Sequence, residues 1–532
     1  MSGEPGGPAA RYVLAVDMGS GAVKTALVER SGRIAATATR PVTLTHLPGG
    51  GVEQDPEEWW DAVCEAGSEV VRRSGADPGA VLAVRCTTQW ATTVAVDAAG
   101  HPISPAISWM DTRAGPAVRD LVSGPVSIEG YDVRLLPRWL RLTGGAPVRA
   151  GMDGFGHLVY LKRERPEVYG AASAFLEPMD YLNARLSGRV AASYGTMYPY
   201  WLTDNRDVER VRYDPVLVRR AGVDPAKLPE LLPVDAEVGK LTAEAARRLG
   251  LRTETKVMAG MSDLQAAAVG AGIVEEGRGY FSIGTSSWLS CLVPAKKTDI
   301  LHLIATMPAG LPGRHMVVAE QGPAGRCLEF LRDTLLVGGR DGDPPAPDEV
   351  FERFERDAAS VPPGCDGLIF TPWLTGVLAP AGDAFTRSAF FNQSLTTSRA
   401  HYVRAVMEGV AYNLRWLKGH VERFSRNRFS TLPFIGGAAL SPTWSQILAD
   451  VLGCEVARVS EPRHANAAGA ALAGFAALGE ISPAEIPDRV EIAATHRPDP
   501  AAARVHDRRF EEFRRLYRRN RRLYAAINRG AG

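Results

Sequence analysis

The same short pattern occurs at two places in this sequence. Residues 12–28 contain two apolar runs separated only by a turn at Gly19, and residues 279–293 repeat this arrangement around Gly284. Each stretch predicts a strand, a tight turn and an antiparallel strand. Their repetition indicates an internal duplication, and therefore two similar domains with a boundary near residues 272–278.

Length and composition agree with two domains. The chain has 532 residues, of which 45% are hydrophobic and 23% charged, the balance of a soluble globular protein too long for one core. Helical stretches such as residues 56–73 alternate with apolar strands such as residues 81–86. This alternation predicts an α/β fold in which helices cover a sheet. We expect a first domain over residues 11–272, a second over 273–485, and a helical extension over 486–532.

Charge and cysteine content exclude several classes of protein. The formal net charge is +1, so no global field favours nucleic acid or an anionic membrane. The six cysteines lack Cys-x-x-Cys spacing, which favours reduced thiols. Residues 1–10 do not have the pattern of a signal peptide, and no run is long and apolar enough to span a bilayer. We therefore expect a cytoplasmic protein with no nucleic-acid or membrane partner.

The last helix predicted by the sequence, over residues 504–524, has one apolar face and a strongly basic remainder. The apolar positions recur at steps of three and four: Phe510, Phe513, Leu516, Tyr517, Asn520, Leu523 and Tyr524. This spacing favours a packed helix with a solvated basic face. The alternative is a site for nucleic acid or a membrane.

The two turns are candidate phosphate-binding sites. In the first, Gly19 lets a phosphate approach the backbone, Ser20 can donate a hydrogen bond to it, and Lys24 follows on the next strand. Asp17 ends the strand before the turn, where a carboxylate suits Mg²⁺. Either turn alone is equally consistent with an ordinary hairpin. Gly284 and Thr285 repeat the arrangement. Together the two turns favour a site that binds a polyphosphate from two sides.

A third candidate site lies where an apolar strand ends at Gly436 and Gly437 and a helix begins after Ser441. Ser441 is a good N-cap, and Pro442 suits the first helical position. Glycines beside a helix start would let an adenine or ribose lie against the backbone. The alternative is simply a glycine-rich turn between a strand and a helix, because the spacing does not match the common dinucleotide or lysine-containing phosphate motifs.

Asp263 lies where another apolar strand changes to a helix. Two roles suit a carboxylate at this position: an N-cap of the helix, or a general base that takes a proton from an attacking hydroxyl. Position alone favours the cap.

Together these motifs resemble the FGGY family of carbohydrate kinases, over about residues 12–479. Asp17-Met-Gly-Ser-Gly-Ala-Val-Lys24 and Gly284-Thr285-Ser286 are similar to the family's two phosphate motifs, and Gly436-Gly437-Ala438-Ala439-Leu440-Ser441 is similar to its adenosine motif. Gly260-x-x-Asp263 falls where the family has its catalytic aspartate. Gly322-x-x-Gly325 is also typical.

The resemblance implies two ribonuclease-H-like domains with a nucleotide-binding cleft between them. It implies an ATP-dependent kinase that phosphorylates a small sugar or polyol. Asp263 would then be the base, and Asp17 would hold Mg²⁺ through water. The ATP-binding set would be Gly19, Ser20, Lys24, Gly284, Thr285, Gly325, Gly436, Gly437 and Ser441. Asp263 would also contact the sugar, together with Gln89, Trp90 and Asp111. A homodimer is one expected assembly.

The sequence departs from the family pattern at the positions that recognise the substrate. After Gln89 stands Trp90-Ala91-Thr92, whereas glycerol kinases usually have Arg-Glu there and xylulose kinases Met-His-Gly. Gly376-Val377-Leu378 replaces a stretch that often contains Gly-Glu-Arg, and the family signature at residues 388–404 is weak. We expect a ketopentose such as xylulose, or a similar sugar, to be a better acceptor than glycerol. Sugar-independent ATP hydrolysis, a catalytically weak sugar-binding regulator and a nucleic-acid binder remain alternatives.

Overall fold

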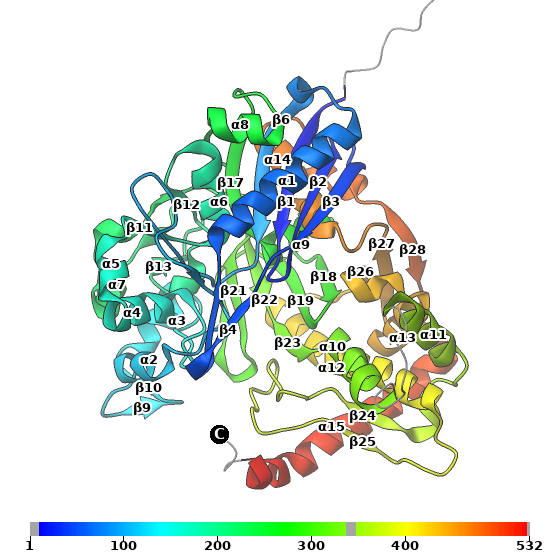
Figure 1. Cartoon of the computed structure of the whole chain (residues 1–532). Coiled ribbons are helices and arrows are strands. Elements are labelled where there is room, and N and C mark those ends of the chain that lie inside the picture. Colours follow the sequence, from blue (N-terminus) through cyan, green and yellow to red (C-terminus); the bar gives the residue numbers. More distant parts are fainter. Residues whose placement is uncertain (1–9, 337–346, 529–532) are drawn as a thin grey trace, which may run out of the picture.

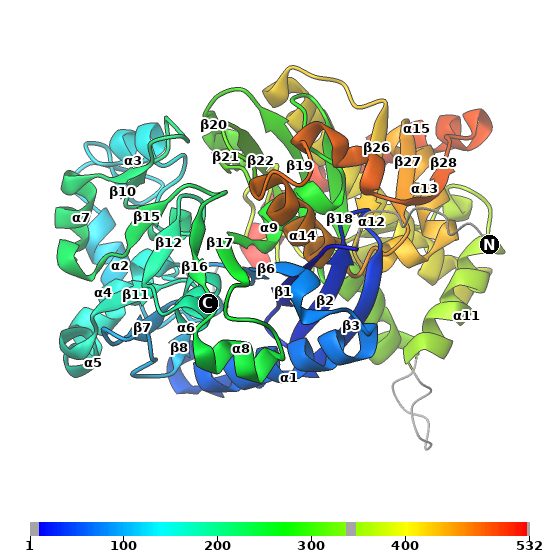
Figure 2. The same ribbon diagram turned by 90° about the horizontal axis from the view of Figure 1, so that it is seen from above.

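The computed structural model describes residues 10–336 and 347–528 and has two α/β domains (Figure 1). The N-terminal tail predicted at residues 1–10 lies outside the described residues except for Ala10. Each domain is built on a mixed sheet with helices on its faces. In the view from above, the early part of the chain lies on one side and the later part on the other (Figure 2). The expected α/β class and the two domains are confirmed.

The first domain contains a six-stranded sheet in which the hairpin β1–β2 is extended by parallel strands. The spatial order is β16 (Glu237–Lys240), β17 (Lys256–Ser262), β6 (Val81–Thr88), β1 (Tyr12–Met18), β2 (Ala22–Glu29), β3 (Ile34–Pro41). β1, β6 and β17 run parallel, and β2, β3 and β16 are antiparallel to their neighbours. One face is covered by α1 (Pro56–Ser74) and α6 (Pro178–Ser187). The predicted strand–turn–strand and the helix at 56–73 are confirmed.

The second sheet repeats this order. From its middle to one edge, the strands are β19 (Ser286–Val293), β18 (Gly279–Ile283), β26 (Thr431–Ile435), β27 (Glu455–Val459) and β28 (Ile492–His496). β18 and β19 form the antiparallel hairpin, β18, β26 and β27 are parallel, and β28 is antiparallel at the edge. This order and these directions match β2, β1, β6, β17 and β16. The predicted internal duplication is therefore confirmed by topology.

Two small-residue helices pack closely beside the first sheet. α9 (Asp263–Gly270) follows β17, and α14 (Ala465–Ala477) follows β27, yet α14 contacts β1 and β6 of the first sheet. A Cβ atom on Gly270 would lie 1.9 Å from the Ala465 carbonyl oxygen, and one on Gly469 would lie 2.0 Å from that of Ala266. Only glycine at these two positions lets α9 and α14 approach so closely. The second part of the chain thus returns a helix to the core of the first domain.

The C-terminal extension is integrated into the second domain. β28 completes the second sheet, and α15 (Pro500–Asn528) packs against α12 (Arg399–Ser425) and α13 (Pro442–Leu452). Phe513 and Tyr517 are buried as predicted, but Leu523 is 57% exposed, so its assignment to the packed face was wrong. The helix extends beyond the surface that it covers. Within the described residues, no helix is both long and apolar enough to cross a membrane.

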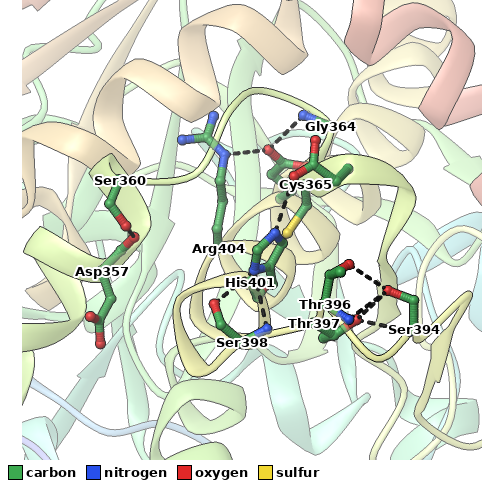
Figure 3. A network of polar contacts seen from close by, with 12 residues as sticks. Asp357, Ser360, Gly364, Cys365, Ser394, Thr396, Thr397, Ser398, His401 and Arg404 are labelled. Carbon is green, nitrogen blue, oxygen red and sulfur yellow. Dashed lines mark hydrogen bonds and ion pairs between the residues drawn. The ribbon is translucent and has the colours of Figure 1, made fainter.

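The weak family signature at residues 388–404 lies where α12 begins (Figure 3). His401 Nδ1 is 2.8 Å from Ser398 Oγ, and the Cys365 thiol donates to the His401 carbonyl oxygen. The buried Arg404 side chain donates to Glu408 at 2.7 Å. The Ser398 and Arg404 contacts stabilise the first turns of α12, and the Cys365 contact joins α12 to the short helical turn at residues 365–367, so all three are structural.

Candidate functional site

A closed ring of hydrogen bonds fixes the turn between β1 and β2. Ser20 Oγ donates to Gln89 Oε1 at 2.6 Å, and Gln89 Nε2 donates to Gln54 Oε1 at 2.7 Å. Gln54 Nε2 then donates to the Ser20 carbonyl oxygen at 2.9 Å. Trp109 Nε1 adds a bond to Ser20 Oγ at 3.1 Å. The ring preorganises the turn that the sequence singled out as a phosphate site.

Asp17 lies at the end of β1, buried beside Lys24. Lys24 Nζ is 3.6 Å from the Asp17 carboxylate, and the two residues are cross-strand neighbours. Burial raises the pKa of Asp17, whereas Lys24 and a hydrogen bond from Asn466 act in the opposite direction. A buried carboxylate with one nearby cation suits a hydrated Mg²⁺, which would bring nucleotide oxygens with it.

The second turn approaches the start of α10 (Gly325–Phe330). The Gly325 N–H donates to the Gly284 carbonyl oxygen at 2.9 Å, and the Ala324 N–H donates to that of Thr285 at 2.9 Å. A Cβ atom on Gly325 would lie 2.4 Å from the Gly284 oxygen, so only glycine fits. The Thr285 side chain is exposed. The structure thus brings Gly284, Thr285 and Gly325 together, although they are far apart in the sequence.

The two adjacent glycines after β26 have different roles. Gly436 has φ of 91°, and a Cβ atom there would lie 2.5 Å from the Ile283 carbonyl oxygen, so this glycine is required by the fold. Gly437 is exposed, and a Cβ atom there would meet no heavy atom within 4 Å. Open space beside exposed backbone fits an adenosine. The predicted N-cap is confirmed, because Ser441 Oγ accepts from the Trp444 N–H at 2.9 Å; the Ser441 hydroxyl also donates to Glu355.

Asp263 is the first residue of α9, and it is not the cap. Ser262 is the N-cap and forms a capping box with Gln265. The half-buried Asp263 carboxylate accepts from the N–H of Leu264, at 2.8 Å. The capping role that position alone favoured is therefore wrong.

The surroundings of Asp263 make its carboxylate more basic than an ordinary one. Loss of hydration raises the pKa of Asp263 to about 7, opposed by the Leu264 N–H and reinforced by the negative charges of Asp17 and Glu320. Asp17 belongs to the first turn, and Glu320 is hydrogen-bonded to Ser286 beside the second turn. Asp263 is thus within electrostatic range of both turns. A carboxyl group with a pKa near neutrality suits a general base.

Sequence reasoning missed several residues that hold Asp263 and the two turns in position. Tyr280 Oη donates to the Leu264 carbonyl oxygen at 3.1 Å, and Trp288 Nε1 donates to Tyr280 Oη at 3.2 Å. Side chains of the second domain thereby hold the first turn of α9, which carries Asp263. Trp109, Gln54 and Glu320 were missed as well. Gln54 lies in a stretch, residues 53–60, that is typical of the family, but its role was not predicted; Trp109 and Glu320 lie outside the motifs, and only the folded chain brings all three to the turns.

The three predicted sugar-pocket residues have other contacts. Gln89 belongs to the ring around Ser20. The Trp90 ring stacks on Tyr198 at 5.5 Å between centroids, and its Nε1 donates to the Thr196 carbonyl oxygen at 3.0 Å. The buried Asp111 carboxylate accepts from the Val52 N–H at 2.9 Å and pairs with Arg113 at 2.6 Å. Gln89 therefore lies beside the first turn, and Trp90 packs on Tyr198. The Asp111 carboxylate already has two partners, the Val52 N–H and Arg113.

Two turns of the kind that suits phosphate, and a desolvated carboxylate within electrostatic range of both, match what phosphoryl transfer from a nucleotide needs. Comparison with known proteins agrees. Residues 12–270 match the N-terminal domain, and residues 279–478 the C-terminal domain, of the FGGY family of carbohydrate kinases. The chain belongs to this family and is a sugar kinase. Sugar kinases of the family use ATP, and their structures have two domains with a cleft between them.

Individual relatives cover nearly the whole chain. Xylulose kinase of Bacillus subtilis (strain 168) is 26% identical over 97% of this chain and 99% of its own length. Gluconokinase of the same strain is 24% identical over 93% of each chain. The crystal structure of gluconate kinase from Lactobacillus acidophilus superposes with a TM-score of 0.83 at 20% identity, covering 98% of this chain and all of that one. The latter similarity concerns the fold.

Proposed function

We propose that this kinase transfers the γ-phosphate of ATP to a hydroxyl of a small neutral sugar, with a ketopentose such as xylulose preferred to glycerol. The observation that carries the proposal is Asp263, which is free of the cap, half-buried and within electrostatic range of both turns. ATP with Mg²⁺ would supply the phosphoryl group. Asp17 would hold the hydrated ion, while Lys24, Thr285 and the backbone of Ser20 and Gly284 would contact phosphates, because the Ser20 hydroxyl donates to Gln89.

In this mechanism Asp263 orients the acceptor hydroxyl and takes its proton. Tyr280 holds the first turn of α9, so the carboxylate keeps its direction. Gly325 allows the second turn to approach closely, and Gly436, Gly437 and Ser441 line the adenosine site. The protein's contribution is therefore positioning, exclusion of water and one base, which is sufficient for phosphoryl transfer.

The choice of substrate rests on the groups available near the first turn. Trp90 and Ala91 stand where glycerol kinases usually have Arg-Glu, so the charged groups that hold glycerol are missing. Trp90 presents a flat ring that can cover the C–H surface of a sugar. Arg113 uses its guanidinium on Asp111 and Glu53, at 2.6 Å each, which leaves it poorly placed for the carboxylate of gluconate. A neutral sugar fits these groups better than a sugar acid.

A panel of acceptors tests this proposal. We expect the highest kcat/KM with xylulose or a closely related ketose, lower values with gluconate, and the lowest with glycerol. Coupled-assay rates should be measured for each acceptor and for ATP alone. Glycerol as the best acceptor would contradict the substrate assignment. Equal ATP turnover without any sugar would favour an ATPase, and no turnover with any acceptor would favour a regulator.

The same reaction should depend on pH through Asp263. The carboxyl acts as a base only when ionised, and its pKa is raised to about 7. With the preferred acceptor, kcat/KM should therefore be constant at high pH and fall about tenfold per pH unit below about 7. The measurement is a pH profile from 5 to 9, at constant ionic strength and with stability checked at each pH. A profile that is flat down to pH 5 would contradict the role of Asp263.

A further inference from the structure

A pocket of about 740 Å³ lies on the first domain, outside the residues of the proposed phosphoryl-transfer site. Its walls come from α3 (Leu136–Leu142), the hairpin of β13 (Thr203–Asp204) with β14 (Arg212–Tyr213), and the start of α7 (Pro215–Ala221). Its charged lining residues are Arg138, Arg141, Arg206, Arg212, Asp204 and Asp214. Four guanidinium groups thus share one concave surface with two carboxylates, an excess of two positive charges.

Two of these arginines are held in place by the carboxylates. Arg138 donates to both Asp214 oxygens, at 3.0 and 2.6 Å, and Arg206 donates to both Asp204 oxygens, at 2.9 and 2.7 Å. Each bidentate pair uses two of the five N–H donors of its arginine, so three donors remain for another acceptor. Both side chains are therefore oriented before any ligand arrives.

In the described part of the chain, the other two arginines have no acceptor of their own. Within residues 10–336 and 347–528, neither the Arg141 nor the Arg212 side chain makes a hydrogen bond or an ion pair. Arg212 stands opposite Asp204 in the β13–β14 register, and Asp204 already pairs with Arg206. An anion in the pocket would relieve the repulsion among the four cations and use donors that have no partner. The excess charge matches a phosphate dianion.

The backbone that carries this pocket touches the second domain. Lys296 Nζ donates to the Leu140 carbonyl oxygen at 2.5 Å, and Thr298 Oγ1 donates to that of Gly144 at 2.8 Å. His315 Nε2 donates to the Asn205 carbonyl oxygen at 3.1 Å. Lys296 lies between β19, the strand that follows the second phosphate turn, and β20 (Thr298–Asp299), which Thr298 begins. A ligand that orders these walls would therefore bias the relative positions of the two domains.

We propose that this arginine-lined pocket is a regulatory site for a small phosphorylated anion, and that its occupancy changes the affinity of the kinase for nucleotide. The chemistry that it recognises is a phosphate or pyrophosphate group, either inorganic or carried by a phosphorylated metabolite. The site does not depend on which sugar the kinase phosphorylates, so it can be tested by binding alone.

The test compares pyrophosphate binding to the parent protein and to the double variant R141Q/R212Q. Both side chains are exposed and unpaired, so the variant should keep the parental melting temperature. Calorimetry in EDTA should show at least tenfold weaker binding at one site in R141Q/R212Q. A matched control, R518Q/R519Q on the exposed face of α15, removes the same charge and should bind like the parent. Equal affinity in parent and R141Q/R212Q would overturn the site.

Coupling to the nucleotide needs a second measurement, the affinity for a fluorescent ADP analogue with and without pyrophosphate. Direct competition at the phosphate turns would persist in R141Q/R212Q, whereas an effect transmitted from the pocket would disappear. We expect about a fivefold or larger difference between parent and variant in the shift that pyrophosphate causes. The same shift in both proteins would overturn regulation. Inorganic phosphate and a sugar phosphate, titrated in the same way, distinguish the possible sources of the anion.

Discussion

Asp263→Asn is expected to lower turnover by about 10²–10⁴-fold, the usual contribution of a general base. The amide keeps the size of the side chain and still accepts from the N–H of Leu264. It cannot take a proton from the acceptor hydroxyl. Nucleotide affinity should change little, because the carboxylate belongs to the acceptor side of the site. The measurements are turnover with saturating sugar and ATP, nucleotide affinity, and melting temperature.

The stability of the variants distinguishes a general base at Asp263 from a residue that caps the helix. The folded pKa of Asp263 is about 7, above its ordinary value of 3.8, so its contribution to the stability of the folded state falls as the pH rises from 3.8 to about 7, and the loss is complete above 7. Asp263→Asn should therefore melt at the same temperature as the parent at pH 8, or higher. Ser262→Ala removes the real cap and should cost about 1 kcal/mol of stability. Asp120→Asn changes an exposed carboxylate and serves as the chemical control. Turnover of Asp263→Asn within threefold of the parent would remove Asp263 from the mechanism.

Gly437→Val is expected to weaken ATP binding by about 10- to 100-fold, the equivalent of about 1–3 kcal/mol of steric overlap. The branched side chain would occupy the space that we assign to the adenosine. Because a Cβ atom at Gly437 meets nothing within 4 Å in the free protein, the variant should fold normally. Binding of the sugar, measured by calorimetry, should remain close to the parental value.

The neighbouring glycine is not suitable for this test. A side chain at Gly436 would collide with the Ile283 carbonyl oxygen in any state of the protein, so its loss of function would say nothing about the ligand. Gly419→Val on α12 is a better control, because a Cβ atom there also meets nothing within 4 Å. If Gly437→Val folds and binds ATP as tightly as Gly419→Val, the adenosine site lies elsewhere.

The local pattern of the sequence determined the elements that carry the site. Alternating and continuous apolar runs predicted β1, β2, β18 and β19, and the turn residues between them follow from backbone sterics. Ser441 and Pro442 begin α13 as expected, and Gly453 ends it as the C-cap. These features depend on residues within a few positions of one another. For this reason they can be predicted from the sequence alone, and so can the internal duplication that they indicate.

Only the tertiary structure decided how these elements work together. Gln89 was predicted to contact the sugar, and the fold shows its amide bonded to Ser20 and Gln54. The pKa of Asp263 depends on dehydration and on Asp17 and Glu320, and the three residues come from separate segments of the chain. Likewise, α14 reaches the first domain, and the arginine pocket forms, through contacts between distant residues. Desolvation and charge interaction depend on distance in space, which the order of residues does not give.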